Sequence, residues 1–335
     1  MSIETLYILI LVIPLVTAVG VLLFRKNENV RESVTLLGGI SLFFVVAKLA
    51  MNYDFEQAVT LTLLEPFPGL SISLRLEPLG LIFTLVAGFL WPVTSLYAIG
   101  YMRSHHEKNQ TRFYFAFAIS IFATMAIALS ANLLTLFIAY ELLTLFTLPL
   151  VTHAGTDAAR KAGWTYLGIL MTTSIGFLLL AIIWTWSLTG TLEFTPGGIL
   201  DGKAEPAILG GLLLLFVFGT GKAALMPFHR WLPAAMVAPT PVSSLLHAVA
   251  VVKAGVFTIL KVSVYIFGID LIGSLDAAYW LSMLAGFTIV SASIIAMTKD
   301  NLKARLAYST ISQLSYIILA AMLGVAAGVY AGSLH

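Results

Sequence analysis

Long apolar runs separated by short polar links dominate this chain of 335 residues. A run of about 20 mostly apolar residues is the length that an α-helix needs to cross the hydrocarbon core of a bilayer. We count about ten such runs, at residues 5–24, 33–51, 78–102, 113–130, 132–151, 163–187, 208–228, 242–263, 278–298 and 306–328. The pattern predicts an all-α, polytopic membrane protein with about ten transmembrane helices.

The links between these runs alternate in charge. Basic residues gather in every second link, at Arg25, Lys26 and Arg31, at Arg103, Lys108 and Arg112, at Arg160 and Lys161, at Arg230, and at Lys299, Lys303 and Arg305. The other links are acidic or neutral, with Asp54, Glu56 and Glu65, then Glu193, Asp201 and Glu205, then Asp270 and Asp276. Because positively charged loops stay on the cytoplasmic side, the alternation predicts an N-terminus outside and a last helix that exits outward.

Three short stretches do not follow the transmembrane pattern. Residues 52–77 alternate apolar and polar side chains, which predicts a short external hairpin or ordered loop. The first run is preceded by acidic Glu4 and followed by basic residues, so we expect a retained helix rather than a cleaved signal peptide. Residues 329–335 resemble the opening turn of another helix, which predicts either a fragment or completion by a partner chain.

The composition supports a membrane protein. Apolar residues make up 59% of the chain and charged residues 10%, whereas a soluble domain carries about 25% charge. The net charge of +2 says little about partners, because the position of each charge matters more than the sum. The chain contains no cysteine, which excludes disulfides, thiolate metal sites and cysteine-ligated iron–sulfur clusters within it.

Six ionisable residues fall inside the apolar runs: Lys48, Glu141, Lys222, His247, Lys253 and Lys261. A charge at the centre of a bilayer costs roughly 2.5–3.5 kcal/mol on insertion scales, so such residues usually have a function. Lys48 and Lys261 lie near predicted helix ends, where we expect the ammonium to reach the interface. The other four have no short route to water.

Glu141 and Lys222 are the most deeply placed charges. Glu141 sits in the middle of FIAYELLTLF, and Lys222 follows Gly219-Thr220-Gly221 in FVFGTGKAALM. These glycines and Pro227 predict a broken helix, which membrane proteins tolerate only where the freed backbone faces protein or a wet cavity. A buried ion pair that only holds helices together is one interpretation. The other is a proton carrier, because a lysine in apolar surroundings releases its proton more readily.

His247 and Lys253 follow in the next run. Six residues correspond to about 600° of helical rotation, so the two side chains are about 120° apart and could border one chain of water. A lone buried histidine is usually a packed, hydrogen-bonded residue, but this one stands between two membrane lysines. Buried Lys and His beside a broken helix and a carboxylate together predict a proton path.

Three motifs resemble a known family. They are GKAALMPFHRWLPAAMVAPTPVSSLLHAVAVVKAGV, LLTLFIAYELLTLFTLPLV and KDNLKARLAYSTISQLSYIILA. They are similar to the antiporter-like membrane proteins shared by respiratory complex I, Mrp-type cation/proton antiporters and membrane-bound hydrogenases. The resemblance covers most of the chain from about residue 78 onwards, and HAVAVVKAG with Lys253 is closest to the Mrp and hydrogenase types.

The resemblance implies a fold of two inverted five-helix repeats, each with a broken helix. Residues 1–112 would hold N-terminal helices and the external loop, 113–263 the first repeat, and 264–335 a truncated start of the second. It implies that Glu141 tunes Lys222 and that His247 and Lys253 carry protons towards the other repeat. The family's second broken helix and its Lys or Glu are absent, and His335 falls where the family has a central histidine.

The leading hypothesis is therefore a proton-translocating or cation/proton-exchanging subunit of a larger energy-converting complex, itself without redox chemistry. Partners would be other membrane subunits, lipid and protons, with Na⁺ as a further candidate ion, in the cell membrane of a bacterium or archaeon. The alternatives are a stand-alone transporter or Na⁺/H⁺ antiporter, a haem or quinone protein, and a membrane scaffold. Haem would have His247 alone as an axial ligand. We expect no cofactor, no metal and no nucleic-acid partner.

Overall fold

The computed structural model describes the chain except for residues 55–57, 246–249, 325–331 and 334–335. Within that part, seven helical segments are long and apolar enough to cross a membrane, namely α1 (Ile3–Leu23), α2 (Glu28–Asn52), α3 (Pro78–Ser104), α4 (Gln110–Leu129), α5 (Leu133–Val151), Asp157–Thr189 and α13 (Asp276–Met297). The segment Asp157–Thr189 consists of α6 (Asp157–Thr173), a π-helical turn (Ser174–Leu178) and α7 (Leu179–Thr189). The protein is thus a polytopic, all-α membrane protein, as predicted.

The other three predicted spans are not among these seven segments. The first is α8 (Pro206–Gly219) with the irregular segment that follows it. The second contains α10 (Thr240–Ser244) and α11 (Val251–Val262), and the third is α14 (Leu302–Met322). Two short helices, α9 (Trp231–Ala234) and α12 (Ile269–Ser274), lie in the connections.

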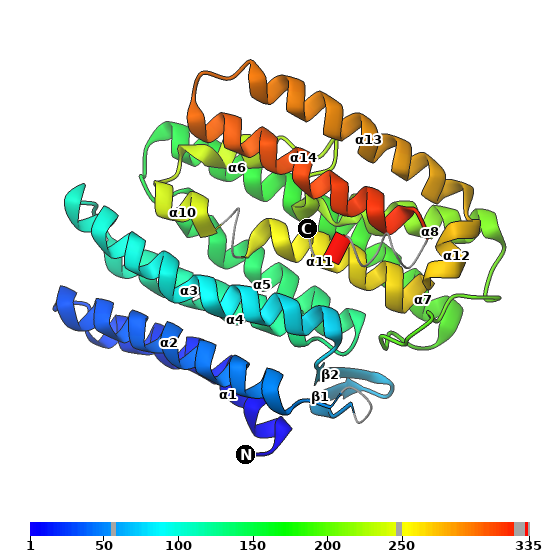
Figure 1. The fold of residues 1–335 in the computed structure, drawn as a ribbon, viewed down its shortest axis with the longest axis horizontal. Helices are drawn as coiled ribbons and strands as arrows, with labels where there is room; N and C mark the ends of the chain where they lie inside the picture. The colour runs from blue at the N-terminus through cyan, green and yellow to red at the C-terminus, as the bar shows by residue number, and fades with distance from the viewer. Residues whose placement is uncertain (55–57, 246–249, 325–331, 334–335) are drawn as a thin grey trace.

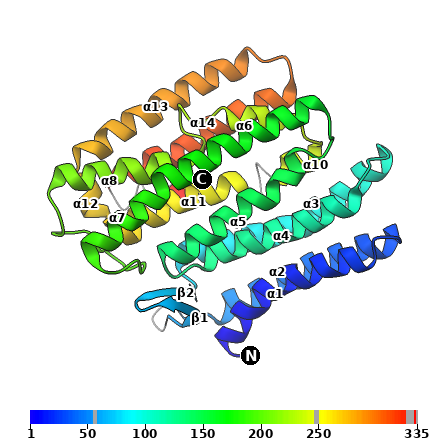
Figure 2. The ribbon, with the colours of Figure 1, turned by 180° about the vertical axis from the view of Figure 1, so that it is seen from behind.

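The long helices run roughly side by side along the longest axis of the molecule (Figure 1). The α1–α2 pair forms one edge and the α13–α14 pair the opposite edge, and the view from behind shows the same order (Figure 2). Between these pairs lies α4, the most buried of the long helices, with 83% of its apolar window inside the protein. Alanines and small polar residues along α4 allow neighbouring helices to approach closely, which is how helices associate without a hydrophobic driving force in lipid.

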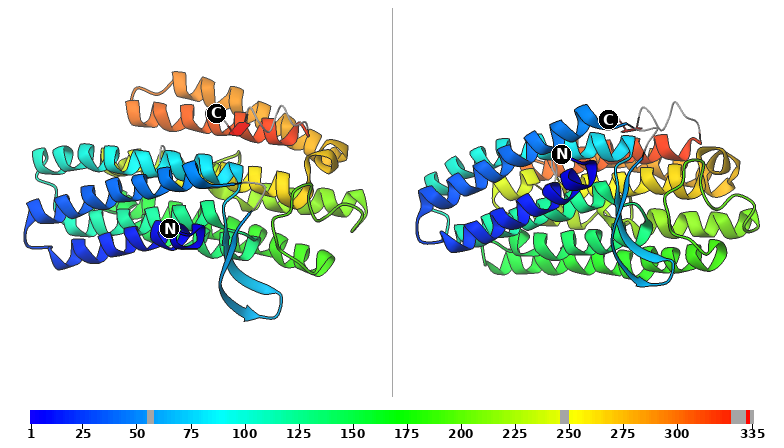
Figure 3. Two further views of the ribbon diagram at one scale, coloured as in Figure 1. Left: turned by 60° about the horizontal axis from the view of Figure 1, so that its bottom comes forward. Right: turned by 90° about the horizontal axis from the view of Figure 1, so that it is seen from below.

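A two-stranded antiparallel hairpin joins α2 to α3, as the alternating pattern predicts. Its strands β1 (Thr60–Phe67) and β2 (Leu70–Arg75) pair with Thr60 opposite Arg75. The hairpin projects from one end of the helical bundle (Figure 3), which we call the hairpin end. It is tied to α5, because the Thr135 hydroxyl accepts a hydrogen bond from the Ser73 amide at 3.0 Å.

The helix predicted to break does so at the expected glycines. Helix α8 ends at Gly219, a 3₁₀ turn covers Gly221–Ala223, and regular α-helix resumes only at Trp231. Ala224 has a φ of 55°, a left-handed conformation that costs about 1–2 kcal/mol for a residue with a side chain. Strain of this kind persists only where the surrounding packing enforces it, and functional sites are where it gathers.

Two of the predicted site positions lie outside the described residues. His247 falls within residues 246–249, and His335 within residues 334–335. The remaining candidates, Glu141, Lys222 and Lys253, are described.

Candidate functional site

Glycines hold the broken segment against its neighbours. A Cβ at Gly219 would overlap the backbone of Leu178 in the π-helical turn, and one at Gly221 would overlap the Thr173 side chain. A Cβ at Gly255 of α11 would overlap the backbone of Lys222 and Ala223. The break is therefore clamped between the π-helical turn and α11, and π-helical turns are frequent at functional sites.

This clamp predicts a position-specific effect of added methyl groups. We expect Gly255→Ala to lower the free energy of unfolding by about 1–3 kcal/mol, because backbone atoms of the break cannot yield as a side chain would. Thermal unfolding of the purified protein in detergent measures the change. Gly286→Ala in α13 is the matched control, since a Cβ there meets nothing within 4 Å. Equal unfolding temperatures for the two variants would contradict the clamp.

Lys222 is wholly buried, with 0% of its surface exposed. Its ammonium donates to the Tyr140 carbonyl at 2.8 Å and to the Thr144 hydroxyl at 2.6 Å. It also lies 3.1 Å from the centroid of the Tyr140 ring, and the Lys222 amide donates to the Tyr140 hydroxyl. One face of α5 thus supplies all of these partners, and nothing in the sequence pattern singles out Tyr140 or Thr144.

Glu141 follows Tyr140 in α5 but makes no direct ion pair with Lys222. Both of its carboxyl oxygens are buried and have no hydrogen-bond partner among the described residues. The geometry is therefore not that of a closed structural ion pair, in which the two charges satisfy each other. A buried carboxyl group without partners is rare in native proteins and requires an explanation beyond stability.

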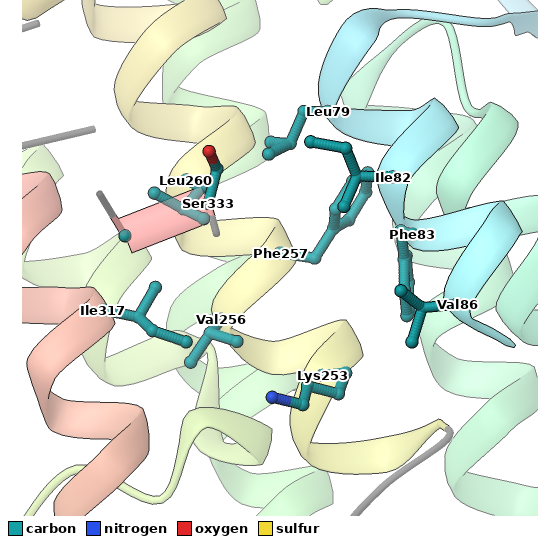
Figure 4. A pocket seen from close by; sticks show the side chains of 11 residues that line it. Leu79, Ile82, Phe83, Val86, Lys253, Val256, Phe257, Leu260, Ile317 and Ser333 are labelled. Atoms are coloured by element: carbon teal, nitrogen blue, oxygen red, sulfur yellow. The ribbon is translucent and has the colours of Figure 1, made fainter. Parts of the chain in front are cut away.

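Lys253 lies on α11, half-buried, between two pockets. One, of about 190 Å³, is largely apolar and runs along α11 and α3 past Phe83 and Phe257 (Figure 4). The other, of about 170 Å³, includes Ser309 and Gln313 of α14. Although α11 packs against the Lys222 backbone, no described contact joins the two ammonium groups. Lys253 thus lies on the helix that packs against the break and lines a pocket beside polar residues of α14.

The position of Lys261 differs from the one that the sequence predicts. We expected it to reach the interface, but it is wholly buried at the hairpin end and forms an ion pair with Glu77 at 3.4 Å. The partner lies far away in the sequence, at the start of α3, so helical spacing could not identify it. The run LRLEP, which starts in β2 and ends at the first residue of α3, signals with Arg75 and Glu77 that charge enters the bundle there.

The chain is similar to several known membrane proteins. Residues 130–335 match the family model described as NADH:quinone oxidoreductase/Mrp antiporter, transmembrane. A protein of Staphylococcus aureus (strain JH9), "Putative antiporter subunit mnhA2", is 34% identical over 266 residues, which are 77% of this chain and 32% of that protein. The chain therefore spans about a third of the length of the curated relatives that it matches.

Two solved structures share the fold. A chain of the Mrp complex from Dietzia sp. DQ12-45-1b superposes with a TM-score of 0.78 at 24% identity, over 100% of this chain and 36% of that one. A chain of the membrane-bound sulfane sulfur reductase, an archaeal respiratory membrane complex, gives 0.80 at 20% identity, over 99% and 68%. Because the family model covers more than half of the sequence, this integral membrane protein belongs to the NADH:quinone oxidoreductase/Mrp antiporter transmembrane family.

Proposed function

We propose that this chain is a proton-translocating, or cation/proton-exchanging, membrane subunit of a larger energy-converting complex. One observation carries the proposal: a wholly buried lysine, Lys222, sits at a strained helix break, and its ammonium has neutral hydrogen-bond partners among the described residues. A charge so placed is expensive in a membrane and is retained where it moves or binds an ion. The names of the relatives, an antiporter subunit and two membrane complexes, support the same class.

In the proposed path Lys222 holds and releases the proton. The Tyr140 carbonyl and the Thr144 hydroxyl bind the ammonium form, and the hydroxyl can donate to the neutral amine after the proton leaves. Glu141 follows Tyr140 in α5, and a negative charge there favours the ammonium form of Lys222 without a direct contact. Lys253, which lines a pocket with Ser309 and Gln313 of α14, receives the proton next. We include His247, which lies outside the described residues, as a further proposed carrier.

The relatives are an antiporter subunit and chains of two membrane complexes, so we propose that other membrane subunits are the partners of this chain. Residues 113–263 would form the first five-helix repeat, and residues 264–335 would begin the second. Purification of the complex through a tag on this chain, followed by reconstitution in vesicles with a pH-sensitive dye, tests the proposal. If vesicles that contain the intact complex show no proton movement when the driving gradient is applied, the proposal is refuted.

We also propose that the chain lies in a bacterial or archaeal cell membrane. The alternation of basic and acidic links along the sequence supports an orientation with the N-terminus and the hairpin end outside. We expect Lys108→Cys and Asp201→Cys to react with an impermeant maleimide from opposite sides of intact cells, because both positions are exposed. Asp201→Cys should react directly, and Lys108→Cys only after permeabilisation. Reaction of both cysteines from one side would contradict the topology.

A further inference from the structure

The proposed path through Lys222 leaves one buried group of charges unused, at the hairpin end of α11. The Lys261 ammonium lies 3.4 Å from one carboxyl oxygen of Glu77, and it also donates to the Ser130 carbonyl and hydroxyl. The other carboxyl oxygen of Glu77 accepts a hydrogen bond from Arg75 at 3.0 Å. Lys261 is fully buried, whereas 7% of the Glu77 side chain and 19% of the Arg75 side chain are exposed. The group thus leads from the interior towards solvent.

Several elements packed around Lys261 contribute polar or charged groups. Glu77 precedes α3, Arg75 ends β2, and Glu193 lies in the loop after α7. Asn132, at the start of α5, donates to the Glu193 carboxylate at 3.1 Å. Glu77 therefore contacts both Lys261 and Arg75, and Glu193 adds a second carboxylate nearby through Asn132. The Lys261 ammonium also lies 4.2 Å from the centroid of the Phe194 ring.

Helix α11 carries both Lys261 and Lys253. The two lysines are separated by about 12 Å along the helix axis, at about 1.5 Å per residue. The apolar pocket beside Lys253 extends along α11 as far as Leu260 (Figure 4). Within it the Phe83 and Phe257 rings pack with centroids 4.8 Å apart. Phe257 also faces Lys261, at 5.6 Å from its ammonium. An aromatic pair thus separates the two lysines.

We propose that Lys261 and Glu77 form the proton-release site of this chain at the hairpin end, with Phe83 and Phe257 as the barrier between it and Lys253. The inference rests on the proposed function. Lys261, as ammonium, passes a proton to the facing oxygen of Glu77, which leaves a neutral amine and a carboxylic acid. Glu77 then gives the proton to water at the exposed side, beside Arg75, and the amine takes the next proton from Lys253 through water that enters the pocket between them. No other bond changes.

A structural ion pair is the competing explanation, and the contacts of Glu77 distinguish the two. The oxygen facing Lys261 is buried, and the Lys261 ammonium lies 3.4 Å from it, whereas a closed charge-assisted hydrogen bond measures about 2.7–2.9 Å. A pair that only docks the hairpin gains most from closed hydrogen bonds, and apolar residues of similar volume often replace such pairs without loss of stability. The Glu77 oxygen that faces Lys261 is the atom that would accept the proton in the proposed transfer.

Three variants of the intact complex test the release site in vesicles. Lys261→Arg retains the charge but cannot give up its proton, and Glu77→Gln retains the shape but cannot accept one. The double variant Lys261→Met, Glu77→Leu removes both charges together. We expect each to lower the rate of proton transport at least tenfold in complexes that assemble normally. Lys48→Arg, at an exposed lysine of α2, is the control and should transport at the normal rate.

The outcomes separate this inference from the proposed function. Normal transport by the double variant would show a dispensable structural pair and overturn the release site. If none of the three variants assembles, the Lys261–Glu77 pair serves folding, and the proposed release site is likewise overturned. If Lys222→Arg is inactive while the Lys261 variants transport normally, the proposed function stands and the release site falls. If Lys222→Arg transports protons normally, the proposed function is refuted, and the release site that rests on it falls as well.

Discussion

Lys222→Arg is expected to assemble normally and to lose at least 90% of its proton transport in vesicles. An arginine retains the positive charge beside Glu141 and can donate to the Tyr140 carbonyl and the Thr144 hydroxyl, so a purely structural role would survive the change. A role as a proton carrier would not survive, because the guanidinium does not release its proton at any pH the protein meets. The substitution therefore separates holding a charge from moving one.

Two further variants make this result interpretable. Lys222→Ala should lose transport to a similar extent, and thermal unfolding of the same preparation shows how far the buried space it leaves weakens the fold. Lys48→Arg should change neither assembly nor transport, because Lys48 is exposed on α2. Normal transport by Lys222→Arg, measured by dye quenching in vesicles that contain equal amounts of complex, would remove Lys222 from the path and leave the ion-pair interpretation standing.

The helices and the break could be predicted from the sequence because their causes are local. A span requires only a sufficient run of apolar residues, so α1 to α5 lie within a few residues of the predicted runs. The break depends on Gly219, Gly221 and Pro227, whose backbone preferences act wherever they occur. The hairpin follows from a period of two between the predicted helices, which the pairing of Thr60 with Arg75 confirms.

The partners of the buried charges could not be predicted, because they come from distant parts of the chain. Lys222 and Tyr140 are 82 positions apart, and neither residue type signals the other. Lys261 looked like a lysine near a helix end, whereas the fold brings Glu77 against it and buries the Lys261 side chain completely. The contact between Gly255 and the Lys222 backbone likewise exists only after the helices pack. Tertiary packing, not local sequence, decides which buried charges meet.

The same limit applies to Glu141 and Lys222. Their types and depth predicted an interaction, but the structure places Tyr140 and Thr144 against the ammonium and leaves the Glu141 oxygens without hydrogen bonds. An electrostatic attraction does not require contact. Over about one helical turn, 5.4 Å, and with an effective dielectric constant near 20, two opposite unit charges attract by about 3 kcal/mol. That is about a hundredfold in an equilibrium constant, at about 1.4 kcal/mol per tenfold.

Glu141→Gln is therefore expected to slow proton transport by tenfold or more while the complex assembles normally. The amide has nearly the shape of the carboxyl group, so packing is preserved, but the attraction that favours the ammonium form of Lys222 is lost. Glu141→Asp retains the charge at a shorter reach and should keep a larger share of the transport rate. Glu205→Gln, at an exposed position before α8, is the control and should have no effect. Transport rates in vesicles, measured with thermal unfolding of the same preparations, decide the matter. An unchanged rate in Glu141→Gln would mean that Lys222 works without this carboxylate, and the unpartnered oxygens would then require a contact with a partner chain instead.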